Sequence, residues 1–171
     1  FEGWGVYVDY SSTSTGEVYN VVMRCNGITT PIWDCGTGII QSLPVVIRAC
    51  QPAENPTLVV FEEPESHLNP AAHAELCQLI VDSTEEDENK RYMIETHSHT
   101  FIRRLQRLLA EGKLNPDNVA LYYVKYNEVE RSSQLERIEM MQDGSIPQWP
   151  KGMFQDVMKE LMVRNNARFG D

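Results

Sequence analysis

The chain of 171 residues carries 15 Lys and Arg against 25 Asp and Glu, a formal charge of −10, with 42% hydrophobic residues. This length and composition predict a globular chain with a buried core and exclude wholesale disorder. No apolar run approaches the roughly 18 residues of a membrane span, and the acidic balance argues against a protein that coats nucleic acid. The four Cys stand singly, which favours reduced thiols in a cytoplasmic protein over a disulfide framework.

The first third of the chain predicts β structure. Residues 4–10 alternate apolar with small or polar side chains, residues 11–16 read as a turn, and residues 17–25 return as the second strand of a hairpin. Residues 28–33 are a candidate third strand.

The following segment, residues 39–50, is apolar and predicts a buried helix in spite of Pro44. Residues 58–61 are four consecutive β-favouring apolar residues, the pattern of a strand covered on both faces in a parallel sheet. A helix is predicted from Pro70 to about Ser83, and a second buried strand over residues 91–96.

Apolar residues then recur at helical spacing from Phe101 to Leu109, and Gly112 ends that helix. Residues 119–126 and 134–141 predict a closing hairpin, and residues 153–163 a last helix. Strands and helices alternate between residues 58 and 126, which predicts an α/β fold with a parallel sheet.

Two adjacent carboxylates, Glu62 and Glu63, end the first buried strand. Open α/β sheets bind ligands at the carboxyl ends of their strands, so these acids are predicted to lie in a site. Because neighbouring residues on a strand point opposite ways, we expect the two to have different tasks. One can hold a divalent cation, and the other can orient or deprotonate an attacking water.

The next strand ends close to His97, which is expected at the same sheet edge and within reach of a bound phosphate. An alternative is a metal pair of His97 and His99 with Glu62 or Glu63, ranked second because no further ligand stands at a telling spacing.

Glycines precede the helix over residues 39–50. Gly36 and Gly38, with Thr37 between them, place free backbone N–H groups at a helix N-terminus, where anions bind. The sequence contains no Gly-x-x-x-x-Gly-Lys-[Ser/Thr], so these residues include no P-loop.

These motifs together resemble a known family. Residues 61–70 resemble the Walker B strand, catalytic glutamate and D-loop of ABC-type ATPases, most closely the branch of the SMC, RecF and overcoming-lysogenization-defect proteins. Residues 95–98 resemble that branch's H-loop, and residues 34–44 its signature segment. The tail from Asp143 to Phe154 resembles a C-terminal domain of unknown function found in certain prokaryotic ATPases of this type.

The resemblance implies a role for each matching residue. Glu62 would help to hold Mg²⁺ through water, Glu63 would be the general base, and His97 would contact the γ-phosphate of ATP. Gly36, Thr37, Gly38 and Gln41 would face a nucleotide bound to a second protomer, and Ser66 and Asn69 would lie at the seam of that homodimer.

The resemblance also implies a division of the chain. Residues 1–126 would form the C-terminal lobe of the ATPase and residues 127–171 the extension. The family's Walker A segment would precede Phe1 in a longer protein, and we expect this lobe not to hydrolyse ATP unaided. DNA-related processes, antiphage defence and regulation of an effector protein are all compatible with such a switch.

Two other functions compete with this one. The first is a binding module that pairs with another polypeptide and regulates it without turnover. The second is a metal-dependent nuclease of the Toprim kind, which is disfavoured because the sequence has no Asp-x-Asp.

Overall fold

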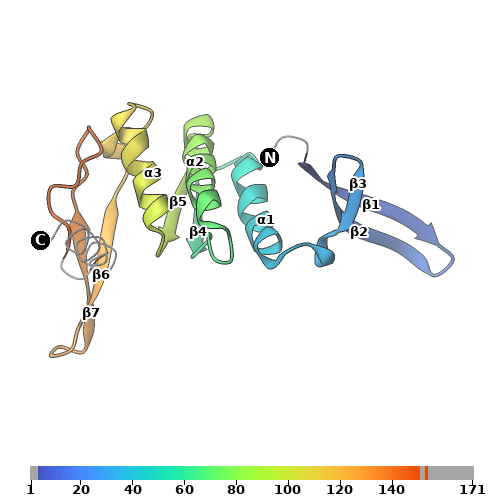
Figure 1. Ribbon diagram of the computed structural model, residues 1–171, viewed down its shortest axis with the longest axis horizontal. Helices are drawn as coiled ribbons and strands as arrows, with labels where there is room; N and C mark the ends of the chain where they lie inside the picture. The colour runs from blue at the N-terminus through green and yellow to red at the C-terminus, as the bar shows by residue number, and fades with distance from the viewer. Residues whose placement is uncertain (1–3, 151–152, 154–171) are drawn as a thin grey trace, which may run out of the picture. The chain divides into compact units, whose positions relative to one another are not determined.

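The computed structural model describes residues 4–150 and 153, and Figure 1 shows its elements in chain order. Contacts divide the chain into two units, residues 1–97 and 98–171. The first unit contains β1 (Trp4–Thr13), β2 (Gly16–Cys25), β3 (Ile28–Pro31), the 3₁₀ turn η1 (Ile32–Asp34), α1 (Thr37–Cys50), β4 (Thr57–Glu62), α2 (Pro70–Glu86) and β5 (Lys90–Glu95). The second contains α3 (His99–Ala110), η2 (Pro116–Asn118), β6 (Leu121–Asn127) and β7 (Ser132–Ile138).

An antiparallel sheet in the order β1-β2-β3 opens the first unit. The predicted hairpin is confirmed, but its turn is shorter than expected: pairing continues to Thr13 opposite Gly16. Ser and Thr side chains suit paired strands, and only Gly16, with a φ of +139°, needs the freedom of a turn residue. The third strand stops at Pro31, because η1 takes up residues 32–34, of which residues 32 and 33 were expected to be extended.

Helix α1 begins at Thr37, two residues earlier than predicted, with Gly36 as its N-cap. Pro44 lies inside the helix, where its missing N–H removes the usual helical donor to the carbonyl of Ile40. The helix continues to Cys50, and Val45 and Ala49 are its buried residues. The predicted helix is thus confirmed in position and in its tolerance of proline, but the expectation that it is buried is wrong, because Ile40, Val46 and Ile47 are exposed.

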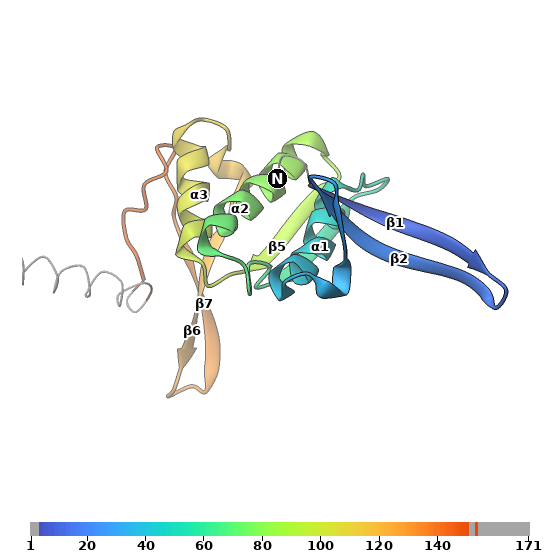
Figure 2. The same ribbon diagram turned by 45° about the vertical axis from the view of Figure 1, so that its right-hand side comes forward.

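Strands β4 and β5 form the predicted parallel pair, in register from Thr57 opposite Lys90 to Glu62 opposite Glu95. Helix α2 lies against β5 (Figure 2). The Tyr92 hydroxyl of β5 lies 2.8 Å from the Ser83 hydroxyl of α2, and the Tyr92 ring stacks on Phe61 of β4 at 5.9 Å. One face of the sheet is therefore packed on α2.

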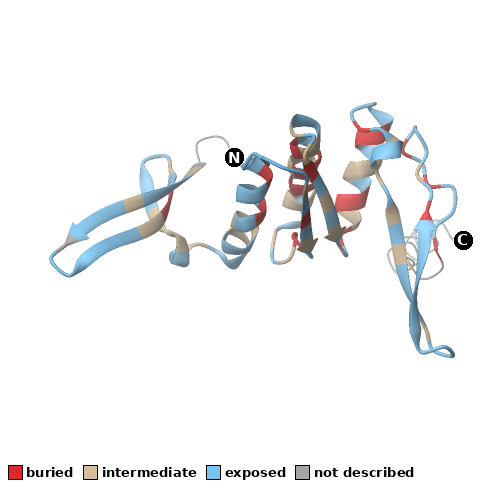
Figure 3. Cartoon of the chain, turned by 180° about the vertical axis from the view of Figure 1, so that it is seen from behind, coloured by how far each residue is buried: buried red, intermediate tan, exposed pale blue. Residues whose placement is uncertain are grey.

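The opposite face of this sheet is exposed, which makes the prediction of a strand buried on both faces wrong for the described residues. Leu58, Val60 and Met93 retain 61%, 52% and 57% of their surface, whereas Val59 on the helix side retains 8%. Figure 3 colours each residue by its burial, and the buried residues of the first unit stand out in α1 and α2. The apolar residues of this strand favour burial of both faces, but the helices of the first unit cover only one of them.

A buried lysine joins three elements at the other end of this sheet. The Lys90 side chain is 5% exposed; its Nζ donates to the Ala49 carbonyl of α1 at 2.6 Å and to Ser83 Oγ of α2 at 3.1 Å. Asp87 Oδ2 lies 3.9 Å away, and the backbone N–H of Ala53 holds the pKa of that carboxyl below its usual value. The ammonium therefore ties both helices to the start of β5.

Replacing Lys90 with methionine is expected to lower the free energy of unfolding by about 1–3 kcal/mol, because the donor to two buried acceptors is lost. Urea unfolding followed by circular dichroism measures the change. The matched control is Lys125→Met, the same substitution at an exposed lysine on β6, for which a change within about 0.5 kcal/mol is expected. Equal midpoints for the two variants would contradict the role given to Lys90.

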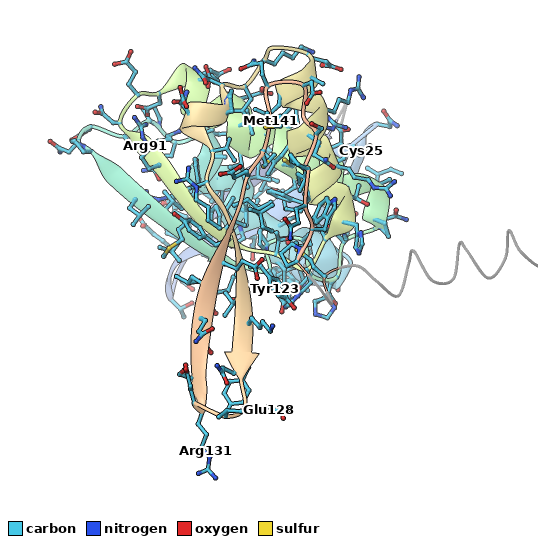
Figure 4. The ribbon with its side chains drawn as sticks, turned by 90° about the vertical axis from the view of Figure 1, so that its left-hand side faces the viewer. Cys25, Arg91, Tyr123, Glu128, Arg131 and Met141 are labelled. Atoms are coloured by element: carbon cyan, nitrogen blue, oxygen red, sulfur yellow. The ribbon has the colours of Figure 1, made fainter. Side chains whose placement is uncertain are left out.

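The second unit has its own core. Ile102 of α3, Ile138 of β7 and Ile146 are buried together, with partly buried side chains packed against them. The predicted closing hairpin is confirmed, and its tip carries Glu128 and Arg131 (Figure 4). β6 pairs with β7 and not with the parallel sheet, so the parallel sheet has two strands and not the three we expected among the described residues.

The α/β fold class is confirmed by the parallel pair β4–β5 with its helical crossover. The predicted helix over residues 153–163 lies outside the described residues. Across residues 4–150 and 153, no helix combines the length and apolarity that a membrane crossing requires.

Candidate functional site

The carboxyl ends of β4 and β5 bring together two segments that are far apart in sequence. Glu62 lies opposite Glu95 in the last register pair, and the Glu63 N–H continues the pairing by donating to the Glu95 carbonyl at 2.9 Å. Residues 63–69 then leave one strand and residues 96–97 leave the other. The predicted meeting of these segments at one sheet edge is therefore seen.

Glu63 does not continue the strand. Its φ is +44°, in the left-handed region, and its carbonyl accepts from the Ser66 N–H at 2.9 Å. The expectation that Glu62 and Glu63 alternate along one strand is therefore wrong, because β4 ends at Glu62 and a turn orients Glu63. The chain reverses within this turn and aims the Glu63 side chain toward the end of β5.

The Glu63 carboxylate connects two predicted site residues. Its Oε1 lies 3.4 Å from Nε2 of His97, and its Oε2 accepts a 2.8 Å bond from the Ser66 hydroxyl. The side chains of His97 and Glu63 are 76% and 49% exposed, so both remain open to a ligand. A carboxylate and an imidazole therefore lie side by side in an exposed position.

Glu62 is exposed at the end of β4, as a residue that reaches a ligand must be. Within the described part of the chain, no group of at least three His, Cys, Asp and Glu side chains is arranged to hold a metal ion. The alternative metal site built on His97 and His99 therefore lacks a ligand set among these residues. In the second unit, burial lowers the pKa of the His99 imidazole, and the positive charge of Arg103 adds to this effect.

Glu65 is a site residue that the sequence did not reveal. It is 5% exposed, and its Oε1 accepts bonds from the Thr96 hydroxyl and, at 3.0 Å, from the backbone N–H of His97. Its other oxygen, Oε2, is buried with no hydrogen-bond partner among the described residues. The only signal was a third acid shortly after Glu62, and spacing alone does not show that an acid is buried.

The two glycines at the start of α1 differ in their surroundings. A Cβ built on Gly36 would meet nothing within 4 Å, whereas one on Gly38 would lie 2.5 Å from the carbonyl oxygen of His67. Gly38 therefore lets the helix pack against the loop that follows Glu63. Gly36 faces open space beside a helix N-terminus that has no side-chain cap, and Thr37 begins that helix.

The remaining predicted residues are placed as follows. Gln41 is exposed on α1. Asn69 caps α2, since its side chain accepts a 3.0 Å bond from the Ala71 N–H. Nothing in the first unit tests whether these two residues contact a nucleotide, so that role stays a prediction.

An open apolar hollow of about 320 Å³ lies beside the start of α1. Strands β2 and β3 contribute Met23, Cys25, Ile28 and Thr30, and Cys35 and Ile39 complete much of the lining. The sequence gave no indication of this hollow, because it forms between segments that local patterns treat separately.

Comparison with solved structures places this architecture among known folds. A structure from work on the ATP-driven dimerisation and DNA-stimulated activation of SMC ATPases superposes with a TM-score of 0.59, at 12% identity, over 94% of this chain and 83% of that chain. The chain shares its fold with SMC ATPase heads. A second structure, the Smc head domain from Pyrococcus furiosus with an extended coiled coil and bound to the C-terminal domain of ScpA, gives 0.54 at 13% identity.

This second superposition covers 96% of the present chain but 34% of the Pyrococcus chain. The present chain therefore spans about a third of the length of that Smc structure. The model of a protein family of unknown function, DUF3696, matches residues 114–163. The predicted resemblances of the main part to an SMC-type lobe and of the tail to a domain of unknown function are thus both confirmed. No curated protein sequence matches the chain.

Proposed function

We propose that this chain is the C-terminal lobe of an ATP-hydrolysing, SMC-type ATPase that acts in the cytoplasm as a nucleotide-dependent dimer switch. The observation that carries the proposal is the contact between Glu63 and His97 at the common end of two parallel strands. Carboxylates at this position of an α/β sheet are suited to ligand chemistry. The SMC-head fold supports the choice of ATP as the ligand.

Glu63 takes the role of general base. It is exposed enough to reach a water; the Ser66 hydroxyl donates to one of its oxygens, and the His97 ring lies beside the other. A positioned carboxylate can orient the attacking water and accept its proton. His97 lies beside it with a ring nitrogen available to contact the terminal phosphate.

Glu62 is the residue that fits a magnesium ion. Mg²⁺ keeps several waters and binds proteins through one or two carboxylates together with substrate phosphates, so a single exposed acid at the strand end matches its needs. When bound, the ion would neutralise charge on the phosphates. The other ligands would come from ATP, from water and from parts of the protein beyond this lobe.

The start of α1 is proposed to bind the nucleotide of a second protomer. Gly36, Thr37 and Gly38 present backbone N–H groups at a helix N-terminus, and the space around Gly36 lets a phosphate approach. Gln41 on the same helix, with Ser66 and Asn69 of the loop after Glu63, would line the seam of the homodimer. The contact of Gly38 with His67 supports this, because it joins the two segments.

The phosphate-cradling Walker A segment is proposed to lie in a preceding part of a longer protein. The exposed apolar face formed by Leu58, Val60 and Met93 supports this, since a sheet face of that kind is normally covered by a further layer. In this proposal residues 1–126 form the ATPase lobe and residues 127–171 form the extension.

We further propose that the switch serves DNA-related or antiphage defence processes, through nucleic acid or an effector protein as partner. One structure with the same fold comes from work on the DNA-stimulated activation of SMC ATPases, which supports the DNA-related part of this proposal.

The test is Mg²⁺-dependent ATP turnover and ATP-dependent dimerisation of the natural full-length protein, with the 171-residue chain alone as the blank. We expect turnover and a nucleotide-induced dimer in analytical ultracentrifugation, while the blank stays inactive. A full-length protein that binds ATP without turnover would favour the non-hydrolysing binding module. Turnover by the blank would contradict the proposal that another segment completes the site.

A further inference from the structure

The turn after β4 holds two acids with different surroundings. Glu63 is half exposed, whereas Glu65, two residues later, retains 5% of its surface. The carbonyl of Glu63 accepts from the Ser66 N–H and that of Glu65 from the Leu68 N–H, so residues 63–68 form one hydrogen-bonded unit. Whatever Glu65 contacts is therefore held at a defined place relative to Glu63.

Glu65 contacts the segment that carries the histidine. One of its oxygens accepts both the Thr96 hydroxyl and the backbone N–H of His97, the latter at 3.0 Å. A carboxylate that accepts a backbone N–H makes a stronger bond than a neutral acceptor does. The main chain at His97 is thus fixed to the same turn whose Glu63 carboxylate lies 3.4 Å from the ring.

The exposure of the histidine makes this anchor important. With 76% of its side chain exposed, the His97 ring has little packing to hold it, and an exposed side chain changes rotamer readily. The ring can remain beside Glu63 only if the backbone from which it extends does not move. Within the described residues, the bond from the His97 N–H to Glu65 supplies that restraint.

Stability alone does not explain a glutamate here. Oε2 of Glu65 is buried without a partner among the described residues, and an unsatisfied buried acceptor destabilises the folded state. A buried acid kept in spite of this destabilisation is typical of sites where geometry serves a reaction.

We propose that Glu65 is a positioning residue: it holds the backbone of His97 so that the imidazole stays in reach of Glu63. This inference rests on the proposed function for its kinetic consequence, but the anchoring itself does not depend on ATP. Glu65 acts through His97 and touches neither the nucleotide nor the attacking water.

The first test measures the anchor without any turnover. Hydrogen exchange at the His97 amide of the full-length protein is expected to be roughly tenfold or more faster in Glu65→Leu, which has no acceptor. Glu65→Gln keeps one oxygen and should give an intermediate rate. Ser83→Ala is the matched control, because it removes a buried hydroxyl at the opposite end of the sheet. Unchanged exchange in Glu65→Leu would overturn the proposal.

The second test separates positioning from general loss of structure. We expect Glu65→Leu to lower kcat about 10- to 100-fold with the KM for ATP changed less than about twofold, and Glu65→Gln to recover much of the rate. Ser83→Ala should lower the melting temperature but leave kcat unchanged below it. In a His97→Ala background, Glu65→Leu should add less than about a twofold further loss.

The outcomes distinguish the two proposals. Fast exchange with a kcat like that of the wild type would overturn the positioning role and leave the ATPase assignment intact. Equal losses of kcat with and without His97 would also overturn it, because Glu65 would then act through the fold as a whole. A wild-type protein without turnover would overturn the ATPase assignment, and the exchange rates would still decide whether Glu65 anchors His97. If Glu65→Leu does not fold, Glu65→Met, which is closer to glutamate in length and has no oxygen acceptor for the His97 N–H, carries the same comparison.

Discussion

Replacing Glu63 with glutamine is expected to lower ATP turnover by the full-length protein about 100- to 10,000-fold, the range that a general base contributes. Glutamine has the same length and keeps an oxygen that can accept from the Ser66 hydroxyl, so the turn that holds residue 63 is retained. What is lost is the negative charge that accepts a proton from water. Initial rates at saturating Mg²⁺ and ATP measure the effect.

Two comparisons sharpen this result. Glu85→Gln, at the exposed end of α2, removes the same charge away from the site and should leave the rate unchanged. Because Glu63→Gln spares the binding residues, the ATP-dependent dimer should still form and should persist longer than in the wild type. A turnover rate within twofold of the wild type would contradict the assignment of Glu63 as the base.

The second large effect is expected from a pair of alanine substitutions at the start of α1. Gly36 has a φ of −60° that any residue adopts, and a Cβ there meets no atom within 4 Å. Gly36→Ala should therefore lower the free energy of unfolding by no more than about 1 kcal/mol, the usual preference of a helix N-cap for Gly over Ala. If a phosphate of the partner's nucleotide approaches this backbone, the added methyl group should weaken ATP-dependent dimerisation and lower turnover roughly tenfold or more.

Gly38→Ala should behave in the opposite way. Its methyl group would lie 2.5 Å from the His67 carbonyl oxygen, so the helix and the loop must separate, at a cost of about 1–3 kcal/mol of stability. Thermal unfolding and sedimentation of both variants, measured side by side, separate the two roles. A Gly36→Ala destabilised as strongly as Gly38→Ala, or a Gly36→Ala that dimerises and turns over ATP normally, would contradict the nucleotide-facing role of Gly36.

The sequence was most informative where local pattern and topology agree. Alternating residues predicted the first hairpin, and an apolar run followed by acids predicted both β4 and the edge at which Glu63 and His97 meet. Parallel strands joined by a helix must end at the same edge, so this juxtaposition required no knowledge of packing.

The sequence was least informative where backbone conformation or distant contacts decide the outcome. The left-handed turn at Glu63 and the burial of Glu65 depend on how the turn packs against the end of β5, which no residue spacing records. The prediction that both faces of the sheet are buried failed for a different reason. The apolar residues Leu58 and Val60 show that a surface must be covered, but not which part of a protein covers it.

The backbone at Glu63 also bears on how such a protein would respond to selection for stability. A φ of +44° is reached easily by glycine and tolerated by asparagine, whereas a glutamate held there costs about 1–2 kcal/mol. Substitutions chosen only to suit the backbone would therefore replace Glu63 and give a more stable protein that lacks the proposed general base. The proposed role of Glu63 thus requires a backbone conformation that lowers the stability of the fold. Thermostabilised variants of this chain should therefore be designed with residue 63 left unchanged.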